Sequence, residues 1–234
     1  MATYVLVHGA WHGAWCWERI VPILEAHGHR VVAVDLPGHG NNPYPVREIT
    51  QKTYTDYLTK VLREIEEPVI LVGHSQGGAV ITQTAEYIPE RIKKLVYIAA
   101  LLMPNGKINA DFITADYGPI FENSEDMTHC TLNEGAIDYL YGNCSEEDAK
   151  NAFARLCVQS HLIHQPMETT EVKFGSVRRV YIETLLDKTL PVGYQRKMQA
   201  VLPCEKVFTL NTDHSPFYSK TKELADILLA QALD

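Results

Sequence analysis

The strongest constraint on the fold is an apolar run that leads into a glycine-flanked serine, Leu71-Val72-Gly73-His74-Ser75-Gln76-Gly77-Gly78. A G-x-S-x-G pattern places its serine on a sharp turn between a strand and a helix, because the glycines let the two elements approach without Cβ clashes. We expect the strand over residues 68–72 and the helix over 79–88, ended by Pro89. Ser75 is then either a nucleophile or a simple helix cap.

Strand and helix patterns alternate along the first hundred residues. Apolar runs predict strands at 4–7, 30–34 and 94–100 beside the one at 68–72, and helical spacing predicts helices at 15–26 and 54–65. The alternation returns late in the chain with strands at 180–182 and 206–210 and helices at 193–202 and 222–233. This order predicts an α/β fold, a mostly parallel doubly wound sheet with its site at the carboxyl edge of the strands.

The alternation is interrupted between residues 104 and 176. An interruption of this length is too long for an ordinary connection, so we expect an inserted helical lid at 104–176, with helices at 138–141 and 146–161. Residues 1–103 and 177–234 would then form the core.

The expected lid is rich in acidic residues. The stretch from 108 to 149 has ten of them and no Lys or Arg: Asp111, Asp116, Glu122, Glu125, Asp126, Glu134, Asp138, Glu146, Glu147 and Asp148. A solvated lid surface explains such a run. A sharper hypothesis is that the run disfavours anionic ligands and helps to expel an acidic product.

Composition narrows the function classes. A chain of 234 residues fits one domain, and its five scattered cysteines indicate reduced thiols rather than disulfides or a zinc site. The net charge of -8 argues against nucleic acid as a partner. The first residues are not typical of a signal peptide and no apolar run reaches membrane-spanning length, so we expect neither feature. We therefore expect a cytoplasmic protein that acts on a small molecule without metal or cofactor, and leave a homodimer open.

A nucleophilic serine needs a histidine to accept its proton and an acid to fix that histidine's tautomer. His214 follows the last expected strand, where this fold would deliver a base above the serine, and we choose it from the ten histidines. His74 is too near Ser75 along the chain to reach its hydroxyl and is interpreted as structural. For the acid, Asp187 follows the strand at 180–182, and Glu183 is the fallback. Asp213 adjoins His214 and is poorly placed to bond its ring.

The other histidines receive weaker interpretations. His27, His29 and His39 lie in expected turns and are predicted to be exposed. His8 and His12 flank the exit of the first strand, where a positioning role and a structural role are equally open. A metal pair at His161 and His164 is a weak alternative without carboxylates nearby.

The loop after the first strand should supply part of an oxyanion hole. The backbone N–H of Ala10 and that of Gln76 are the two expected donors. Trp11, Trp15 and Trp17 surround this loop and could wall an apolar pocket or pack in the core.

Four motifs together resemble the α/β-hydrolase superfamily, and within it the plant methylesterase and hydroxynitrile lyase group. They are residues 8–17 (HGAWHGAWCW), 28–31 (GHRV), 73–78 (GHSQGG) and 173–182 (KFGSVRRVYI). The resemblance covers nearly the whole chain outside the lid. It implies Ser75 as nucleophile, Asp187 as acid, His214 as base, Ala10 and Gln76 as oxyanion donors, and a substrate pocket that involves Trp11, Leu101 and lid residues. Bacterial carboxylesterases of the pyrethroid-hydrolase type share the same core.

Two positions separate this chain from the lyases of the group. The lyases carry a threonine after the first-strand histidine and a lysine after the catalytic histidine, whereas Gly9 and Ser215 stand here. The resemblance therefore implies a serine carboxylesterase acting on small to medium neutral esters. The alternatives are a lactonase, a hydroxynitrile-lyase-like enzyme, or a slowly hydrolysing small-molecule receptor on the same fold.

Overall fold

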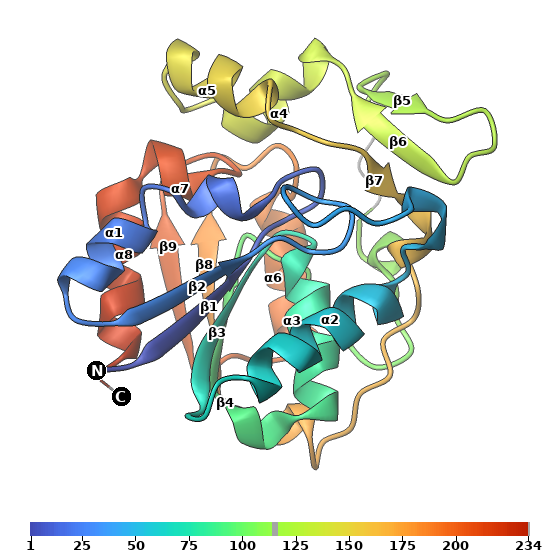
Figure 1. Cartoon of the computed structure of the whole chain (residues 1–234). Helices are drawn as coiled ribbons and strands as arrows, with labels where there is room; N and C mark the ends of the chain where they lie inside the picture. Colours follow the sequence, from blue (N-terminus) through green and yellow to red (C-terminus); the bar gives the residue numbers. More distant parts are fainter. Residues whose placement is uncertain (114–116, 234) are drawn as a thin grey trace.

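The computed structural model describes residues 1–113 and 117–233, and its centre is a six-stranded sheet whose pairings are all parallel (Figure 1). The strands lie in the order β2 (Arg30–Val34), β1 (Thr3–Val7), β3 (Val69–His74), β4 (Ile92–Ile98), β8 (Arg179–Thr184) and β9 (Lys206–Leu210). The predicted α/β fold with a parallel, doubly wound sheet is confirmed.

Both faces of the sheet are covered, which explains the continuous apolar runs of its central strands. Val5 and Val7 pack into a core shared with α2 (Gln51–Arg63), α3 (Gly77–Tyr87) and α6 (Val192–Val201). Tyr4 and Leu6 point the other way, into a core shared with α1 (Val21–Ala26), α7 (Pro216–Ser219) and α8 (Thr221–Gln231). Because successive strand residues face opposite sides, burial of every residue of β1 requires both helical layers.

Two helix starts differ from the sequence prediction for local reasons. The predicted helix at 15–26 is a 3-10 turn at Ala14–Trp17 followed by the short helix α1, which has a proline in its first turn. Proline is tolerated in that first turn and disrupts a helix interior. Helix α2 begins three residues before the predicted start because Thr50 caps it, accepting a hydrogen bond from the Thr53 N–H at 3.2 Å.

Residues 104–176, called the inserted segment below, connect β4 to β8, and their α-helices and short strands lie above the carboxyl ends of the core strands (Figure 1). They include α4 (Ile137–Tyr141) and α5 (Glu146–Phe153), but also an antiparallel sheet of β5 (Phe121–Asn123), β6 (His129–Leu132) and β7 (Gln159–Ser160). The expected helices are present, although the helix predicted at 146–161 ends at Phe153, and the small antiparallel sheet was not predicted. Strands of two to four residues are too short to show an alternating pattern.

The acidic run of the inserted segment meets cations of the core. Ion pairs join Asp148 to Arg19, Asp126 to Arg47 at 2.9 Å, and Asp138 to Lys188 at 2.6 Å. Asp116 lies outside the described residues. Exposed ion pairs contribute about 0–1 kcal/mol each, so these contacts orient the segment more than they stabilise it. Within the described part of the chain, no helix combines the length and apolar character needed to cross a membrane.

The start of α3 packs directly on two backbone carbonyls. A Cβ on Gly77 would lie 2.6 Å from the carbonyl oxygen of His8, and one on Gly78 would lie 2.5 Å from that of Leu101. The helix can therefore approach the exits of β1 and β4 only because these two positions lack side chains.

This contact predicts opposite effects for two glycines that hold the same helical position. Gly78 is the second residue of α3, and Gly193 is the second residue of α6, where an added Cβ would meet no atom within 4 Å. Alanine in a helix gains about 0.5–1 kcal/mol over glycine. We expect Gly193→Ala to raise the free energy of unfolding by that amount and Gly78→Ala to lower it by about 1–3 kcal/mol through overpacking. Urea denaturation of both variants measures the difference, and equal effects would contradict the close contact.

Candidate active site

Ser75 occupies a strained turn between β3 and α3. Its φ is +51°, a left-handed conformation that costs a non-glycine residue about 1–3 kcal/mol. Hydrogen bonds on both sides hold it there: the Ser75 N–H donates to Ile98 O at 3.2 Å, and Ser75 O accepts from Leu101 N at 2.9 Å. The helix-cap interpretation is wrong, because α3 begins at Gly77 and its N-cap position is Gln76.

His214 and Asp187 form a buried pair. The Nδ1 of His214 lies 2.7 Å from Oδ2 of Asp187, and the two side chains are 1% and 0% exposed. Thr184 Oγ1 donates to Oδ2 at 2.9 Å and the Leu190 N–H donates to Oδ1 at 2.7 Å, so the carboxylate is held at both oxygens. With a proton on Nδ1 bonded to the carboxylate, Nε2 of His214 keeps its lone pair.

The two rejected acids have other partners. Glu183, the fallback, accepts hydrogen bonds from Arg196 at 3.0 Å and Gln199 at 3.1 Å. Asp213 accepts from the Asn143 N–H at 2.8 Å and from Ser219 Oγ at 2.7 Å. Asp187 is the carboxylate that the structure brings to His214.

His74 connects the serine turn to the loop that carries His214. Its Nε2 donates to the carbonyl oxygen of His214 at 2.8 Å, and the two rings lie with centroids 4.7 Å apart. Because His74 directly precedes Ser75, this bond fixes His214 beside the turn. The contact agrees with the structural interpretation of His74.

The peptide between Gly9 and Ala10 is oriented by His8. The Leu36 N–H donates to Nε2 of His8 at 3.1 Å, so the ring proton is on Nδ1, which donates to Gly9 O at 2.7 Å. The carbonyl and N–H of a trans peptide point in opposite directions. Holding Gly9 O on one side therefore turns the Ala10 N–H to the other, where Ala10 lines the same pocket as Ser75 and Gln76.

Two further buried histidines continue this network. His12 Nδ1 donates to Ala10 O at 2.7 Å, and its Nε2 accepts from Tyr141 OH of the inserted segment at 2.7 Å. His39 donates from Nδ1 to His12 O at 2.7 Å and accepts from Tyr54 OH at 2.8 Å. The prediction that His39 is exposed is wrong, since only 2% of it is accessible. A turn pattern in the sequence does not reveal that a second loop and the inserted segment cover it.

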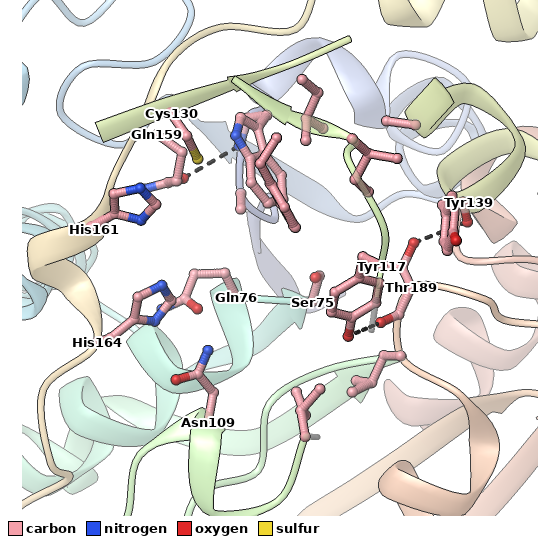
Figure 2. A pocket seen from close by; sticks show the side chains of 18 of the residues that line it. Ser75, Gln76, Asn109, Tyr117, Cys130, Tyr139, Gln159, His161, His164 and Thr189 are labelled. Atoms are coloured by element: carbon pink, nitrogen blue, oxygen red, sulfur yellow. Dashed lines mark hydrogen bonds between the residues drawn. The ribbon is translucent and has the colours of Figure 1, made fainter. Parts of the chain in front are cut away.

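Ser75 opens into a pocket of about 330 Å³ (Figure 2). Trp11 and Leu101 line it as predicted for a pocket, whereas Trp17 is buried in the core and Trp15 lies beneath the Arg155 guanidinium at 4.5 Å. Many of the lining side chains come from the inserted segment, among them Asn109, Tyr117, Phe121, Tyr139, His161 and His164. The sequence alone does not identify these pocket residues, because they belong to no recognisable motif.

His161 and His164 do not form a metal site with other side chains. Their ring centroids are 6.5 Å apart. Across residues 1–113 and 117–233 there is no group of three or more His, Cys, Asp or Glu side chains that could hold a metal ion.

The chain is similar to known proteins along nearly its whole length. Residues 4–227 match the model of the alpha/beta hydrolase family. The chain is 35% identical to putative methylesterase 11, chloroplastic, of Arabidopsis thaliana over 97% of its own length, although it spans only 63% of that relative. It is 33% identical to the alpha-hydroxynitrile lyase of the same plant, covering 99% of this chain and 97% of the lyase. The crystal structure of polyneuridine aldehyde esterase superimposes with a TM-score of 0.89 at 30% identity, covering 99% of both chains.

The buried imidazoles predict an acid-labile fold. Burial is the main cause that lowers the pKa of His8, His12, His39 and His74, to about 3 for His12 and about 4 for His39. Unfolded histidines titrate near pH 6.5, so below that pH the unfolded state binds protons that the folded state refuses. Stability is therefore complete above about pH 6.5 and falls as the pH drops. Four such groups lower the free energy of unfolding by on the order of 5 kcal/mol per pH unit. The total free energy of unfolding of a typical protein is about 5–15 kcal/mol.

Denaturant midpoints between pH 7 and pH 4.5 measure this loss. Some carboxylates, such as Asp148 beside Arg19, have a pKa lowered by ion-pair hydrogen bonds. Their protonation reduces stability only below about pH 4.5, outside the range measured here. His39→Gln should reduce the slope by about one histidine's share of roughly 1.4 kcal/mol per pH unit. His27→Gln, at an exposed position, is the matched control. A flat profile from pH 7 to 5 would contradict the prediction.

Proposed function

We propose that this chain is a serine carboxylesterase for small to medium neutral esters. The chain belongs to the alpha/beta hydrolase family and, within it, to the methylesterase and hydroxynitrile lyase branch. The observation that carries the proposal is Ser75, held at a φ of +51° at the wall of the pocket beside a buried His214–Asp187 pair. Strain of this kind persists only where surrounding contacts enforce it, and it projects the hydroxyl away from the helix it precedes.

The proposed reaction proceeds through an acyl-enzyme. His214 accepts the proton of Ser75 at Nε2 while Ser75 Oγ attacks the ester carbonyl, and Asp187 stabilises the resulting imidazolium. The N–H groups of Ala10 and Gln76 bind the oxyanion. His214 then protonates the leaving alcohol and activates a water molecule, which releases the acid. The inserted segment acts as a lid over the pocket.

Hydrolysis is favoured over the alternatives by particular residues. Gly9 and Ser215 stand at the two positions where the resembling lyases carry threonine and lysine. None of the nine acidic residues that the structure describes in the stretch from 108 to 149 lines the pocket, which favours the solvated-surface interpretation of the acidic run.

Removal of the Ser75 hydroxyl tests the assignment. Ser75→Ala should lower kcat for p-nitrophenyl butyrate by about 10⁴-fold or more, because the nucleophile and base act as a unit. Ser176→Ala, at an exposed serine, should leave kcat unchanged. Multiple turnovers by the wild type distinguish an enzyme from a receptor that hydrolyses once. A Ser75→Ala protein that remains active would overturn the mechanism.

Two substitutions of His8 test whether this residue orients the Gly9–Ala10 peptide or only fills space in the core. Asparagine places its amide near Nδ1 and can keep the bond to Gly9 O, whereas glutamine places its amide near Nε2 and can keep the bond from Leu36 N. Each variant loses one buried hydrogen bond, so both should lose about 1–3 kcal/mol of stability. We expect His8→Gln to lower kcat about 10- to 100-fold with little change in KM, and His8→Asn to retain most of kcat. Equal losses of kcat would show that His8 serves packing alone.

A further inference from the structure

The pocket has two chemically different sides, with Ser75 between them (Figure 2). One side is a chain of aromatic rings. Tyr139 meets Tyr117 with centroids 6.1 Å apart, Tyr117 meets Phe121 at 6.0 Å, and Phe121 meets Trp11 at 5.9 Å. The hydroxyl of Tyr117 donates to Thr189 O at 2.7 Å, which fixes its ring. This side offers apolar ring faces and edges to a ligand.

The other side carries polar side chains whose hydrogen-bonding capacity is largely unused. Gln76, Asn109 and His164 lie across the pocket from Tyr117 and Tyr139 (Figure 2). Gln76 is only 6% exposed, yet its amide makes no hydrogen bond to any described residue. Asn109 uses Oδ1 to accept from the Ala110 N–H at 3.0 Å, which leaves Nδ2 available. His164 is an exposed residue at the wall of the pocket, and its ring has no hydrogen-bond partner among the described residues.

Two neighbouring polar side chains are already engaged, whereas the indole N–H of Trp11 has no hydrogen-bond partner among the described residues. Oε1 of Gln159 accepts from the backbone N–H of Trp11 at 3.3 Å, and its Nε2 donates to Tyr54 OH at 3.0 Å. His161 Nε2 lies 2.9 Å from Oδ1 of Asn123. Gln76 is largely buried as a residue, but its amide is open to the pocket, where an oxygen of a ligand can accept a hydrogen bond from the amide N–H groups.

The polar side is uncharged. Among the described residues that line the pocket there is no Asp, Glu, Lys or Arg. Desolvation at the pocket wall, followed by the nearby His161, lowers the pKa of His164 and so favours its neutral imidazole. A charged ligand group would lose hydration here without gaining an ionic partner. A hydroxyl or ketone oxygen loses far less and matches the donors of Asn109, Gln76 and His164.

We propose that Gln76, Asn109 and His164 form a polar subsite that binds an uncharged oxygen-bearing group of the substrate. The substrate class is then a neutral ester with an apolar or aromatic part on one side of its carbonyl and a hydroxyl or ketone several atoms away on the other. The inference rests on the proposed esterase function and adds the chemistry of the substrate to it.

Two pairs of esters test the subsite with reactivity held constant. Benzyl hexanoate and benzyl 5-oxohexanoate differ in the acyl part, and pentyl phenylacetate and 4-oxopentyl phenylacetate differ in the alcohol part. The ketone is remote from the ester carbonyl in each pair. We expect the wild type to prefer the oxo member of one pair by about tenfold in kcat/KM, the size of one or two neutral hydrogen bonds. The benzyl monoester of adipic acid, which carries a carboxylate, should be hydrolysed more slowly than benzyl hexanoate.

Variants then assign the preference to the subsite. Asn109→Leu and His164→Leu should each reduce it to about twofold or less, with the preference taken as the ratio of kcat/KM for the two members of a pair measured on the same variant. His27→Leu, the same substitution at an exposed position outside the pocket, should keep it. Equal hydrolysis of both members of both pairs by the wild type, or a preference that survives in both subsite variants, would overturn the proposal.

Binding separates this proposal from the proposed function. Calorimetric titration of the Ser75→Ala protein with the intact esters measures the oxo preference without hydrolysis. If the wild type turns over none of the esters while Ser75→Ala still binds the oxo members about tenfold more tightly, the esterase function fails and the subsite stands. If the wild type hydrolyses the esters and neither protein distinguishes the members of a pair, the subsite fails and the esterase function stands.

Discussion

The site depends on how closely the serine turn approaches the backbones beside it. Gly77 and Gly78 bring α3 against the carbonyls of His8 and Leu101, and the bonds of Ser75 to Ile98 and Leu101 hold the turn in its left-handed conformation. These contacts join the exits of β1, β3 and β4 at one edge of the parallel sheet. A side chain at either glycine would separate them, and the serine, the Ala10 loop and Leu101 would no longer share one pocket.

Neutral imidazole rings hold the loops at this edge of the sheet in place through hydrogen bonds. His8, His12, His39 and His74 each donate one ring proton to a backbone carbonyl, and these carbonyls belong to the loops that carry Ala10 and His214. A ring with one donor and one acceptor can link two segments in a buried space where a charge would be too costly. The same burial that gives the rings this role opposes their protonation, so local rigidity and sensitivity to acid have one cause.

The wall of the pocket and the turn at Ser75 come from different parts of the chain. The core provides Ser75, His214, Asp187 and the Ala10 loop, and the segment provides most of the pocket wall. Surface ion pairs such as Asp138 with Lys188 and the buried bond from Tyr141 to His12 attach the segment to the core. Loops and insertions on a rigid scaffold commonly vary in this way while the chemistry stays constant.

The sequence by itself determined the parallel sheet, the turn at Ser75 and the residues placed near it, because strand alternation, glycine spacing and chain order are local signals. It could not determine the small sheet of the inserted segment or the burial of His39, because both depend on contacts between segments far apart in the chain. Only the tertiary structure decided which of Asp187, Glu183 and Asp213 meets His214, since the direction of a carboxylate depends on its hydrogen-bond partners. It also decided that Gln76, Asn109 and His164 face one pocket, which no spacing in the sequence encodes.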